Sequence, residues 1–429
     1  MTSTEANGSR THRPPPVWLF SLLLIPYGIG GAFSSATLGR ILDLNHVGKA
    51  KITTAVSLSV LIAGLQFLWA PTVDIRLRRR SWYLIVAFLG GLLMMAAMFT
   101  PLPSQVDLFI VLVLLAQVAI CLTGPCIGGL MATTVPDELR GRASGFSNFG
   151  NVGVGAIAAG VTLQLIEKGT LHLPLLGEVS SLRATGVVVA ALVMMPALIV
   201  LAVDEPLPPR RTARQIFGAM LRDVWNTIRV PRGWSGILLC LSPVGTAAAM
   251  QLFTSFATAY QASPRMVTVV NGYVGGLLTG AACLLGGWLC DRMNRRVAYL
   301  LSGGLTAAVA LGMALAPMTP STYFWGALSY LFVTGFCYAA FTAVVLEIIG
   351  PAGATASTQY TLFTAAGNQA ISYMIKLDGW GYDLYGHRFG EAVAPRGLLI
   401  ADAVLNVVGI GLFSALLLLL RRSSKLAAP

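Results

Sequence analysis

Polar side chains recur at helical spacing within four strongly apolar segments of the chain. Intervals of three or four residues place side chains on one face of a helix. A carboxamide or hydroxyl on such a face can hydrogen-bond a polar organic molecule, and in hydrocarbon it needs a partner or a water-filled cavity. The side chains that this argument assigns to a candidate substrate-binding set are Tyr27, Ser34, Asn148, Asn151, Gln251, Thr254, Asn368, Gln369 and Tyr373.

The same pattern has a purely structural explanation. Small polar residues let membrane helices pack closely, and for most of the Ser and Thr positions this explanation is the better one. The carboxamides are the better candidates for binding, because an unpaired amide in hydrocarbon is costly. We expect about half of the carboxamides in the set to line a cavity.

Acidic residues precede arginine clusters in two similar connections. Asp74 precedes the cluster at positions 76–80, and Asp291 precedes the cluster at positions 292–296. The second aspartate lies 217 residues after the first, which predicts two parallel, duplicated halves.

Proton coupling would require a carboxylate within the membrane. Glu347 and Asp378 are the sequence candidates for this role. Asp43 and Asp402 fall near predicted span ends, where an interfacial ion pair or a solvated loop acid is the simpler interpretation.

The elements that must position these residues are apolar helices. The 429-residue chain is 55% hydrophobic and 11% charged, whereas a soluble domain carries about a quarter charged residues. Because a membrane core about 30 Å thick requires about 20 apolar residues of helix, we predict an all-α membrane protein of about twelve transmembrane helices in two pseudo-symmetric six-helix halves. The predicted spans are 16–38, 52–70, 82–98, 106–133, 145–165, 184–203, 234–260, 266–289, 297–318, 323–349, 358–375 and 398–420.

The charge distribution predicts the orientation of these spans. The net charge is +12, and 20 of the 29 Lys and Arg residues fall on one side when the N-terminus is placed inside. The positive-inside rule then predicts that both termini are cytoplasmic, in what we expect to be the bacterial inner membrane. The predicted organisation is a tail 1–15, a six-helix bundle 16–203, a linker 204–233, a second bundle 234–420 and a tail 421–429.

Two motifs carry a resemblance to a known family. The eighth predicted span is followed by Gly287-x-x-x-Asp291-Arg292-x-x-Arg295-Arg296, and the fourth by Pro136-x-x-x-Arg140-Gly141-x-Ala143-x-Gly145. Both are similar to loop signatures of the major facilitator superfamily. The resemblance implies transport by alternating access, with a substrate cavity between the halves near the midplane.

The resemblance also implies a gate. In that family the loop aspartate lies beside the positive end of a neighbouring helix and pairs with arginine, so that the two halves are latched. Asp74, Asp291, Arg292 and Arg295 are the positions of this chain that match. The alternative is that the arginines only orient the loops and contact lipid phosphates.

A narrower resemblance rests on two stretches. Phe67-Leu68-Trp69-Ala70-Pro71-Thr72-Val73-Asp74 and Gln359-Tyr360-Thr361-Leu362 are similar to the anhydromuropeptide permease (AmpG) and acetyl-CoA transporter branch. Gln66 stands where that branch usually has a lysine. If that lysine helps to bind an anionic substrate, its replacement argues against the same cargo here.

These patterns predict a secondary active transporter that imports a polar or amphiphilic organic solute with protons, with a muropeptide-, siderophore- or acyl-CoA-like cargo. The alternative is a non-transporting receptor or assembly factor on a transporter fold. The sequence contains no motif typical of an enzyme, a metal site, a cofactor site or an ATP-driven pump. The basic residues lie in short clusters between apolar spans, which is not the pattern of a nucleic-acid-binding surface. The expected partners are the small-molecule substrate, the lipid bilayer and a proton gradient, and we expect a monomer.

Overall fold

The computed structural model describes residues 14–75, 77–173, 177–205, 231–349 and 356–426, together with the isolated positions 218, 222, 225 and 229. Nearly all of the secondary structure in these residues is helical, so the predicted all-α membrane class is confirmed. The predicted tail 1–15 and linker 204–233 lie largely outside the described residues.

The first half contains six predicted spans, several of them built from consecutive helical pieces. Its helices are α1 (Leu19–Ala32), η1 (Phe33–Thr37), α2 (Leu38–Leu44), α3 (Lys49–Leu65), η2 (Gln66–Leu68), η3 (Ala70–Asp74), α4 (Arg79–Phe99), α5 (Val106–Cys121), α6 (Thr123–Thr134), η4 (Asp137–Leu139), α7 (Arg140–Asn148), η5 (Phe149–Val154), α8 (Gly155–Glu167), α9 (Ser181–Ile199) and η6 (Val200–Ala202). A short antiparallel hairpin that was not predicted, β1 (Thr170–Leu173) and β2 (Gly177–Ser180), joins α8 to α9 with Thr170 opposite Ser180.

The second half repeats this plan with a different division into pieces. Its helices are α11 (Pro231–Cys240), η7 (Ala248–Leu252), α12 (Phe253–Phe256), η8 (Ala257–Tyr260), α13 (Pro264–Asn271), α14 (Tyr273–Cys290), α15 (Arg295–Leu315), α16 (Pro320–Ile349), α17 (Ala356–Phe389), η9 (Glu391–Val393) and α18 (Ala394–Leu426). The Asn294 side chain begins α15 by accepting hydrogen bonds from the backbone N–H groups of Arg296 and Val297.

The seventh predicted span is not one helix, so the expectation of a continuous helix over residues 234–260 is wrong. The chain leaves the helical conformation after Cys240, and Gly245 and Ala247 adopt φ values of +63° and +55°. Pro243 cannot donate a backbone hydrogen bond to a helix, and Gly245 accepts the left-handed conformation without a Cβ penalty. We call residues 241–247 the helix break.

Nine helices in the described residues are long and apolar enough to cross a membrane. The predicted first, seventh and eleventh spans fall outside this group, for three different reasons. The apolar helix of the first span, Leu19–Ala32, is too short, the helix break interrupts the seventh span, and α17, which contains the eleventh, is rich in polar residues. α17 also continues to Phe389, well beyond the predicted end at Ile375.

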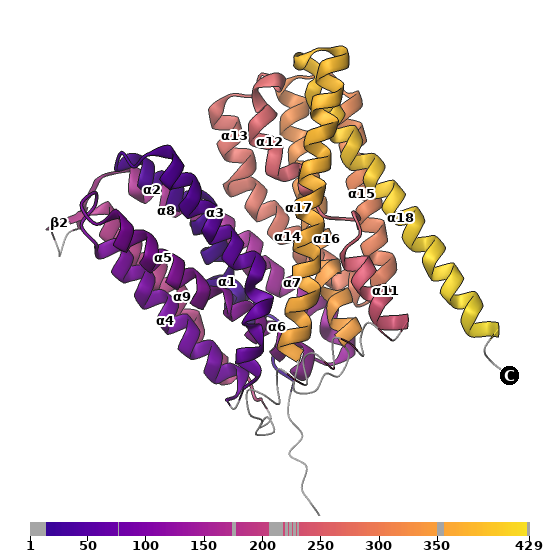
Figure 1. Ribbon diagram of the computed structural model, residues 1–429, viewed down its shortest axis with the longest axis horizontal. Coiled ribbons are helices and arrows are strands. Elements are labelled where there is room, and N and C mark those ends of the chain that lie inside the picture. Colours follow the sequence, from indigo (N-terminus) through magenta and orange to yellow (C-terminus); the bar gives the residue numbers. More distant parts are fainter. Residues whose placement is uncertain are drawn as a thin grey trace, which may run out of the picture.

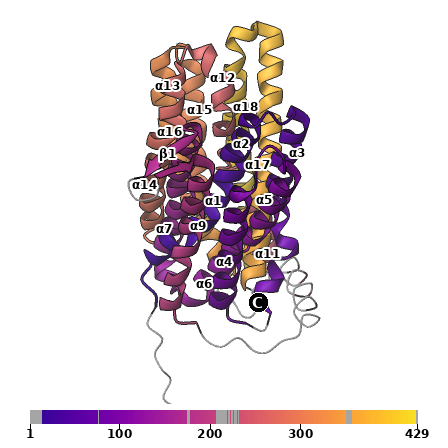
Figure 2. The same cartoon turned by 90° about the vertical axis from the view of Figure 1, so that its left-hand side faces the viewer.

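The two halves converge at one end and diverge at the other (Figure 1). At the converging end, α7 packs against α14 and α16, and α6 and η3 pack against α17. Figure 2 shows the same arrangement from the side of the first half. We call the converging end, which holds Asp74 and Asp291, the gate end.

Glycine permits the closest approach between the halves. A Cβ atom on Gly145 of α7 would lie 2.5 Å from the carbonyl oxygen of Cys283 in α14, and one on Gly287 would lie 2.5 Å from that of Gly141. Any larger residue at these positions would push α7 and α14 apart.

Candidate functional site

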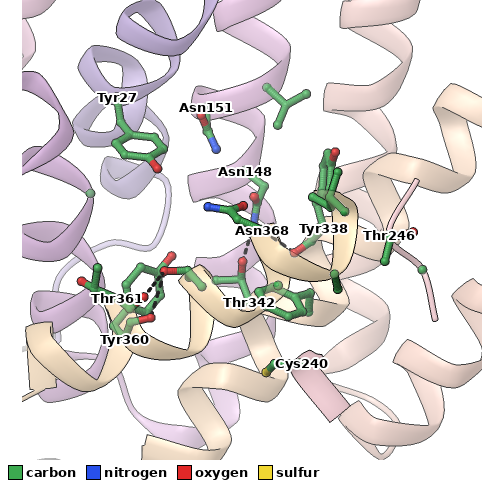
Figure 3. A pocket seen from close by; sticks show the side chains of 18 of the residues that line it. Tyr27, Asn148, Asn151, Cys240, Thr246, Tyr338, Thr342, Tyr360, Thr361 and Asn368 are labelled. Carbon is green, nitrogen blue, oxygen red and sulfur yellow. Dashed lines mark hydrogen bonds between the residues drawn. The ribbon is translucent and has the colours of Figure 1, made fainter. Parts of the chain in front are cut away.

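A cavity of about 270 Å³ lies where the two halves meet. The first half contributes α1, η2, α6, α7 and η5, and the second half contributes the helix break, α15, α16 and α17. Figure 3 shows side chains from both halves pointing into the same space. The cavity is therefore an interface site between the two halves.

The side chains that line the cavity are uncharged. None of the described residues in its wall is Asp, Glu, Lys, Arg or His. The polar members are the carboxamides Gln66, Asn148, Asn151 and Asn368 and the hydroxyl groups of Tyr27, Thr246, Tyr299, Tyr338, Thr342, Tyr360, Thr361 and Thr364. Leu24, Pro125, Val152, Met250, Phe341 and Ile371 supply apolar wall.

Asn148 connects the two halves at the wall of this cavity. Its Nδ2 atom donates to Thr342 Oγ1 at 3.0 Å and lies 3.2 Å from the carbonyl oxygen of Tyr338, both on α16 (Figure 3). The same amide also lies 2.9 Å from the carbonyl oxygen of Ser144 in its own helix. Asn148 thus helps to hold α7 against α16 while its helix borders the binding space.

Gln66 reaches the cavity because α3 ends at Leu65 and the chain turns into η2. Its Nε2 atom donates to the Tyr27 hydroxyl at 3.0 Å, and the residue is only 2% exposed. Its Oε1 atom has no hydrogen-bond partner among the described residues. A buried acceptor beside a cavity is therefore free to receive a donor from a bound molecule.

The helix break is held in place by three side chains. The Tyr299 hydroxyl donates to the Val244 carbonyl oxygen at 2.5 Å, and the Tyr373 hydroxyl donates to that of Leu241 at 2.6 Å. Asn406 Oδ1 accepts from the backbone N–H of Gly245 at 2.8 Å. The break is therefore a fixed part of the cavity wall.

Of the predicted substrate-binding residues, Tyr27, Asn148, Asn151 and Asn368 line this cavity. The other five do not: Ser34 accepts a hydrogen bond from Ser59 at 2.6 Å in the interior of the first half, and Tyr373 braces the helix break. Gln251, Thr254 and Gln369 are exposed outside the wall. Helical spacing misplaced Gln251 and Thr254 because the seventh span is broken before them.

Several lining residues were not in the predicted set. The polar ones are Gln66, Thr246, Tyr299, Tyr338, Thr342, Tyr360, Thr361 and Thr364. Tyr338 lies in the apolar helix α16 and Tyr360 in the more polar α17. In neither helix does the sequence show whether an aromatic ring packs against other side chains or binds a ligand. For Gln66 the sequence offers one signal: the resembling branch usually has a lysine at this position.

Asp74 joins the first half to the N-terminus of α17. Its Oδ1 atom accepts from Arg79 Nε at 3.0 Å, and its Oδ2 atom accepts from the backbone N–H and the hydroxyl of Thr358, at 3.2 and 3.1 Å. Arg79 Nε also lies 2.9 Å from Ser357 Oγ. Burial raises the pKa of the Asp74 carboxyl, and Arg79 and the hydrogen bonds from α17 oppose that rise.

Asp291 makes the matching contact in the opposite direction. Its carboxylate accepts from the backbone N–H groups of Gly141 and Arg142 at 2.7 and 3.1 Å, and from Arg142 Nε at 2.8 Å. Thr358 follows Gly141 by 217 residues, the same interval that separates the two aspartates. Each half therefore places a carboxylate at a helix N-terminus of the other half, where the helix dipole favours negative charge.

The predicted gate arginines behave differently from one another. Arg295 contacts Asp137 of the first half at 3.0 Å, so it bridges the halves. Arg292 instead lies over the Trp288 ring at 3.9 Å, a contact within its own half. Glu347 pairs with Arg296 at 3.4 Å and lies 3.9 Å from Arg295 at the gate end, away from the cavity.

The two remaining acids lie deeper than the sequence suggests. Asp378 is fully buried between α17 and α18 and does not line the cavity. Asp402, for which an interfacial ion pair or a solvated loop acid was the simpler interpretation, is also fully buried, so it is not a solvated acid. The described residues contain no group of three or more His, Cys, Asp or Glu side chains arranged to hold a metal ion.

Comparison with known proteins establishes the family. The model of the Major Facilitator Superfamily matches residues 19–372. The chain belongs to the major facilitator superfamily. Its members are generally transporters rather than enzymes, and the chain is an integral membrane protein of this type. No curated protein sequence matches the chain.

Solved structures of the superfamily share its fold. A variant of the E. coli fucose:proton symporter is 13% identical, with a TM-score of 0.63 over 92% of this chain and 98% of that one. A bacterial homologue of the iron transporter ferroportin, in an outward-facing state, is 14% identical, with a TM-score of 0.62 over 93% and 98%. A proton:xylose symporter bound to 6-bromo-6-deoxy-D-glucose is 13% identical, with a TM-score of 0.59 over 92% and 94%.

Proposed function

We propose that this chain is a secondary active transporter that moves an uncharged polar or amphiphilic organic solute by alternating access, coupled to protons. The observation that carries the proposal is the cavity between the halves, whose described wall offers four carboxamides and eight hydroxyl groups but no charged side chain. Carboxamides and hydroxyls both donate and accept hydrogen bonds, as recognition of a neutral polar molecule requires.

The size and charge of the cavity narrow the cargo. A volume of about 270 Å³ lies just below the usual range for small-molecule pockets, about 300 to 1,000 Å³. An anionic muropeptide or acyl-CoA would need a cation to offset its desolvation, and Gln66 supplies a neutral amide at the position where the resembling branch has lysine. The lining therefore supports a small neutral solute over the anionic cargoes of that branch.

Contacts at the gate end support an outward-facing state. With the termini cytoplasmic, as the 20 basic residues on that side suggest, Asp74 and Asp291 close the cytoplasmic side of an inner-membrane protein. The halves diverge toward the opposite side (Figure 1). Opening would break both contacts together, since each carboxylate belongs to one half and its helix N-terminus to the other.

The fucose and xylose symporters support proton coupling by analogy of fold. The alternative, a receptor or assembly factor that does not transport, predicts binding without flux. A receptor and a transporter would use the same cavity, so a flux measurement is needed to distinguish the two functions.

A binding experiment tests the cavity directly. The purified protein is screened by thermal shift against matched neutral and anionic solutes, such as polyols, sugars, amides and their carboxylated analogues. We expect stabilisation by a neutral compound, lost in Asn368→Ala and kept in the adjacent control Gln369→Ala, because only the first lines the wall. Stabilisation by anions alone, or equal loss in both variants, would contradict the proposal.

A further inference from the structure

Two carboxylates face each other inside the second half, away from the cavity. Asp378 on α17 and Asp402 on α18 are both 0% exposed. The two helices run antiparallel and pack closely: a Cβ atom on Gly381 would lie 2.6 Å from the Cβ of Ala401. Asp378 lies one turn before Gly381 and Asp402 lies one residue after Ala401, so the two aspartates are at the same level of this helix contact. The two carboxylates interact electrostatically.

Within the described part of the chain, one side chain donates a hydrogen bond to the pair. Asp402 Oδ2 accepts from the Tyr330 hydroxyl of α16 at 3.0 Å. The other three oxygens, Asp402 Oδ1 and both of Asp378, have no hydrogen-bond partner among the described residues. Buried polar atoms of native proteins are nearly always paired, so these oxygens indicate a missing donor.

Among the residues that the structure describes, no cation is paired with the two carboxylates. Arg396, on the same helix as Asp402, donates to the Ala316 carbonyl oxygen, and Lys376 points to the exposed surface of α17. Tyr330 and Cys337, both on α16, interact electrostatically with the pair. Other titratable groups on the packed helices include Tyr299 of α15, Tyr382 and the exposed Asp383 of α17, and Arg396 of α18.

Two buried carboxylates without a counterion cannot both be ionised. Burying an unpaired charge costs several kcal/mol of desolvation free energy, and two neighbouring negative charges also repel each other. A proton on one carboxyl removes one charge and supplies the missing donor to the other. We propose that Asp378 and Asp402 together hold one exchangeable proton and form the proton-coupling site of this chain.

The pair is mechanically connected to the cavity. Asn406 lies one turn after Asp402, its Nδ2 atom donates to the Asp402 carbonyl oxygen at 2.9 Å, and its Oδ1 atom holds the Gly245 N–H of the helix break. Gly245 lines the cavity. When the pair loses its proton, the repelling carboxylates strain the α17–α18 contact, and Asn406 passes that strain to the wall of the binding site.

This role differs from that of Glu347, the other acid considered for coupling. Glu347 already pairs with Arg296 at the gate end, so its charge is compensated. The role of the Asp378–Asp402 pair in coupling rests on the proposed transport function, whereas the shared proton itself does not. The existence of the shared proton can be tested without any substrate.

Infrared difference spectroscopy of the protein in lipid nanodiscs, titrated with pH, detects the proton. We expect a protonated-carboxyl band at neutral pH in the wild type and in the exposed control Asp383→Asn, and its loss in the double variant Asp378→Asn/Asp402→Asn. Each single variant leaves one buried carboxyl, so its band should titrate at a shifted pH. A band that survives in the double variant would overturn the inference.

A second measurement excludes a metal cation as the occupant. Thermal stability is recorded at fixed pH in sodium chloride and in choline chloride. We expect no difference between the salts, in the wild type or in the double variant. Saturable stabilisation by sodium that disappears in the double variant would replace the proton with sodium and overturn the proposal.

The outcomes keep the two proposals apart. A band that depends on the aspartates, without flux of any solute, would leave the protonatable site intact and refute transport. Proton-coupled flux that persists in the double variant would refute the site and leave transport intact.

Discussion

The contact made by Asp291 should set how firmly the gate end is closed, and Asp291→Asn tests this with almost no change in shape. The substitution keeps one acceptor but removes the charge and replaces the second acceptor with a donor. That donor would face the backbone N–H and the guanidinium of Arg142. The asparagine side chain therefore no longer supplies the negative charge and the two acceptors that the N-terminus of α7 contacts.

The magnitude follows from the three interactions. The Arg142 side chain is 46% exposed, so its ion pair contributes at most about 1 kcal/mol. The charge at the helix N-terminus contributes about 0.3 to 2 kcal/mol, and a lost hydrogen bond to a charged group about 1.5 to 3. Allowing for the acceptor that Asn retains, we expect about 2 kcal/mol, or about a 30-fold shift toward separation of the halves at this end.

Double electron–electron resonance between labels on the two halves measures this shift. Leu77 and Val297 are 43% and 52% exposed near the gate end, in different halves, and suit cysteine substitution. The six native cysteines are all buried, which favours labelling at the introduced sites. The Asp291→Asn protein should gain a longer-distance population. An unchanged distribution, equal to that of Asp383→Asn, would refute the role assigned to Asp291.

Two further substitutions test packing and the helix break. Gly145→Ala places a Cβ atom 2.5 Å from the Cys283 carbonyl oxygen and should also lengthen the gate-end distance. The control Gly312→Ala, whose Cβ would have no atom within 4 Å, should leave that distance unchanged. The same distance in both variants would contradict the close-packing argument. Asn406→Ala leaves the Gly245 N–H unpaired in the interior and should cost about 1 to 3 kcal/mol, seen as a lower melting temperature than that of the exposed control Thr254→Ala. Equal melting temperatures would show that Asn406 does not hold the break.

Much of the fold was predictable because it depends on properties of single helices. Apolar length and basic loops predicted the helical membrane class, and the repeat of Asp74 and Asp291 predicted two related halves. The same spacing argument found Tyr27, Asn148, Asn151 and Asn368, all on segments that stay helical without a break, although Asn151 lies in the π-helical turn η5. Periodicity works where a helix is continuous.

The misplaced residues lie where continuity fails or where depth depends on a neighbour. Gln251 and Thr254 follow the helix break, which shifts the face that they present. Asp378 was expected near a span end because the eleventh span was predicted to end at Ile375, and Asp402 because the twelfth was predicted to begin at Leu398. In the structure α17 continues to Phe389 alongside α18, and this added length buries both Asp378 and Asp402. This burial depends on how α17 packs against α18, so the sequence of either helix alone does not predict it.

The most direct test of a neutral-solute, proton-coupled transporter is uptake into proteoliposomes under an imposed pH gradient. The solutes are the neutral compounds that stabilise the protein and their anionic analogues. The account predicts gradient-dependent uptake of a neutral solute, abolished in Asn368→Ala and retained in Gln369→Ala. Uptake restricted to anions, or uptake that is indifferent to the proton gradient, would contradict it.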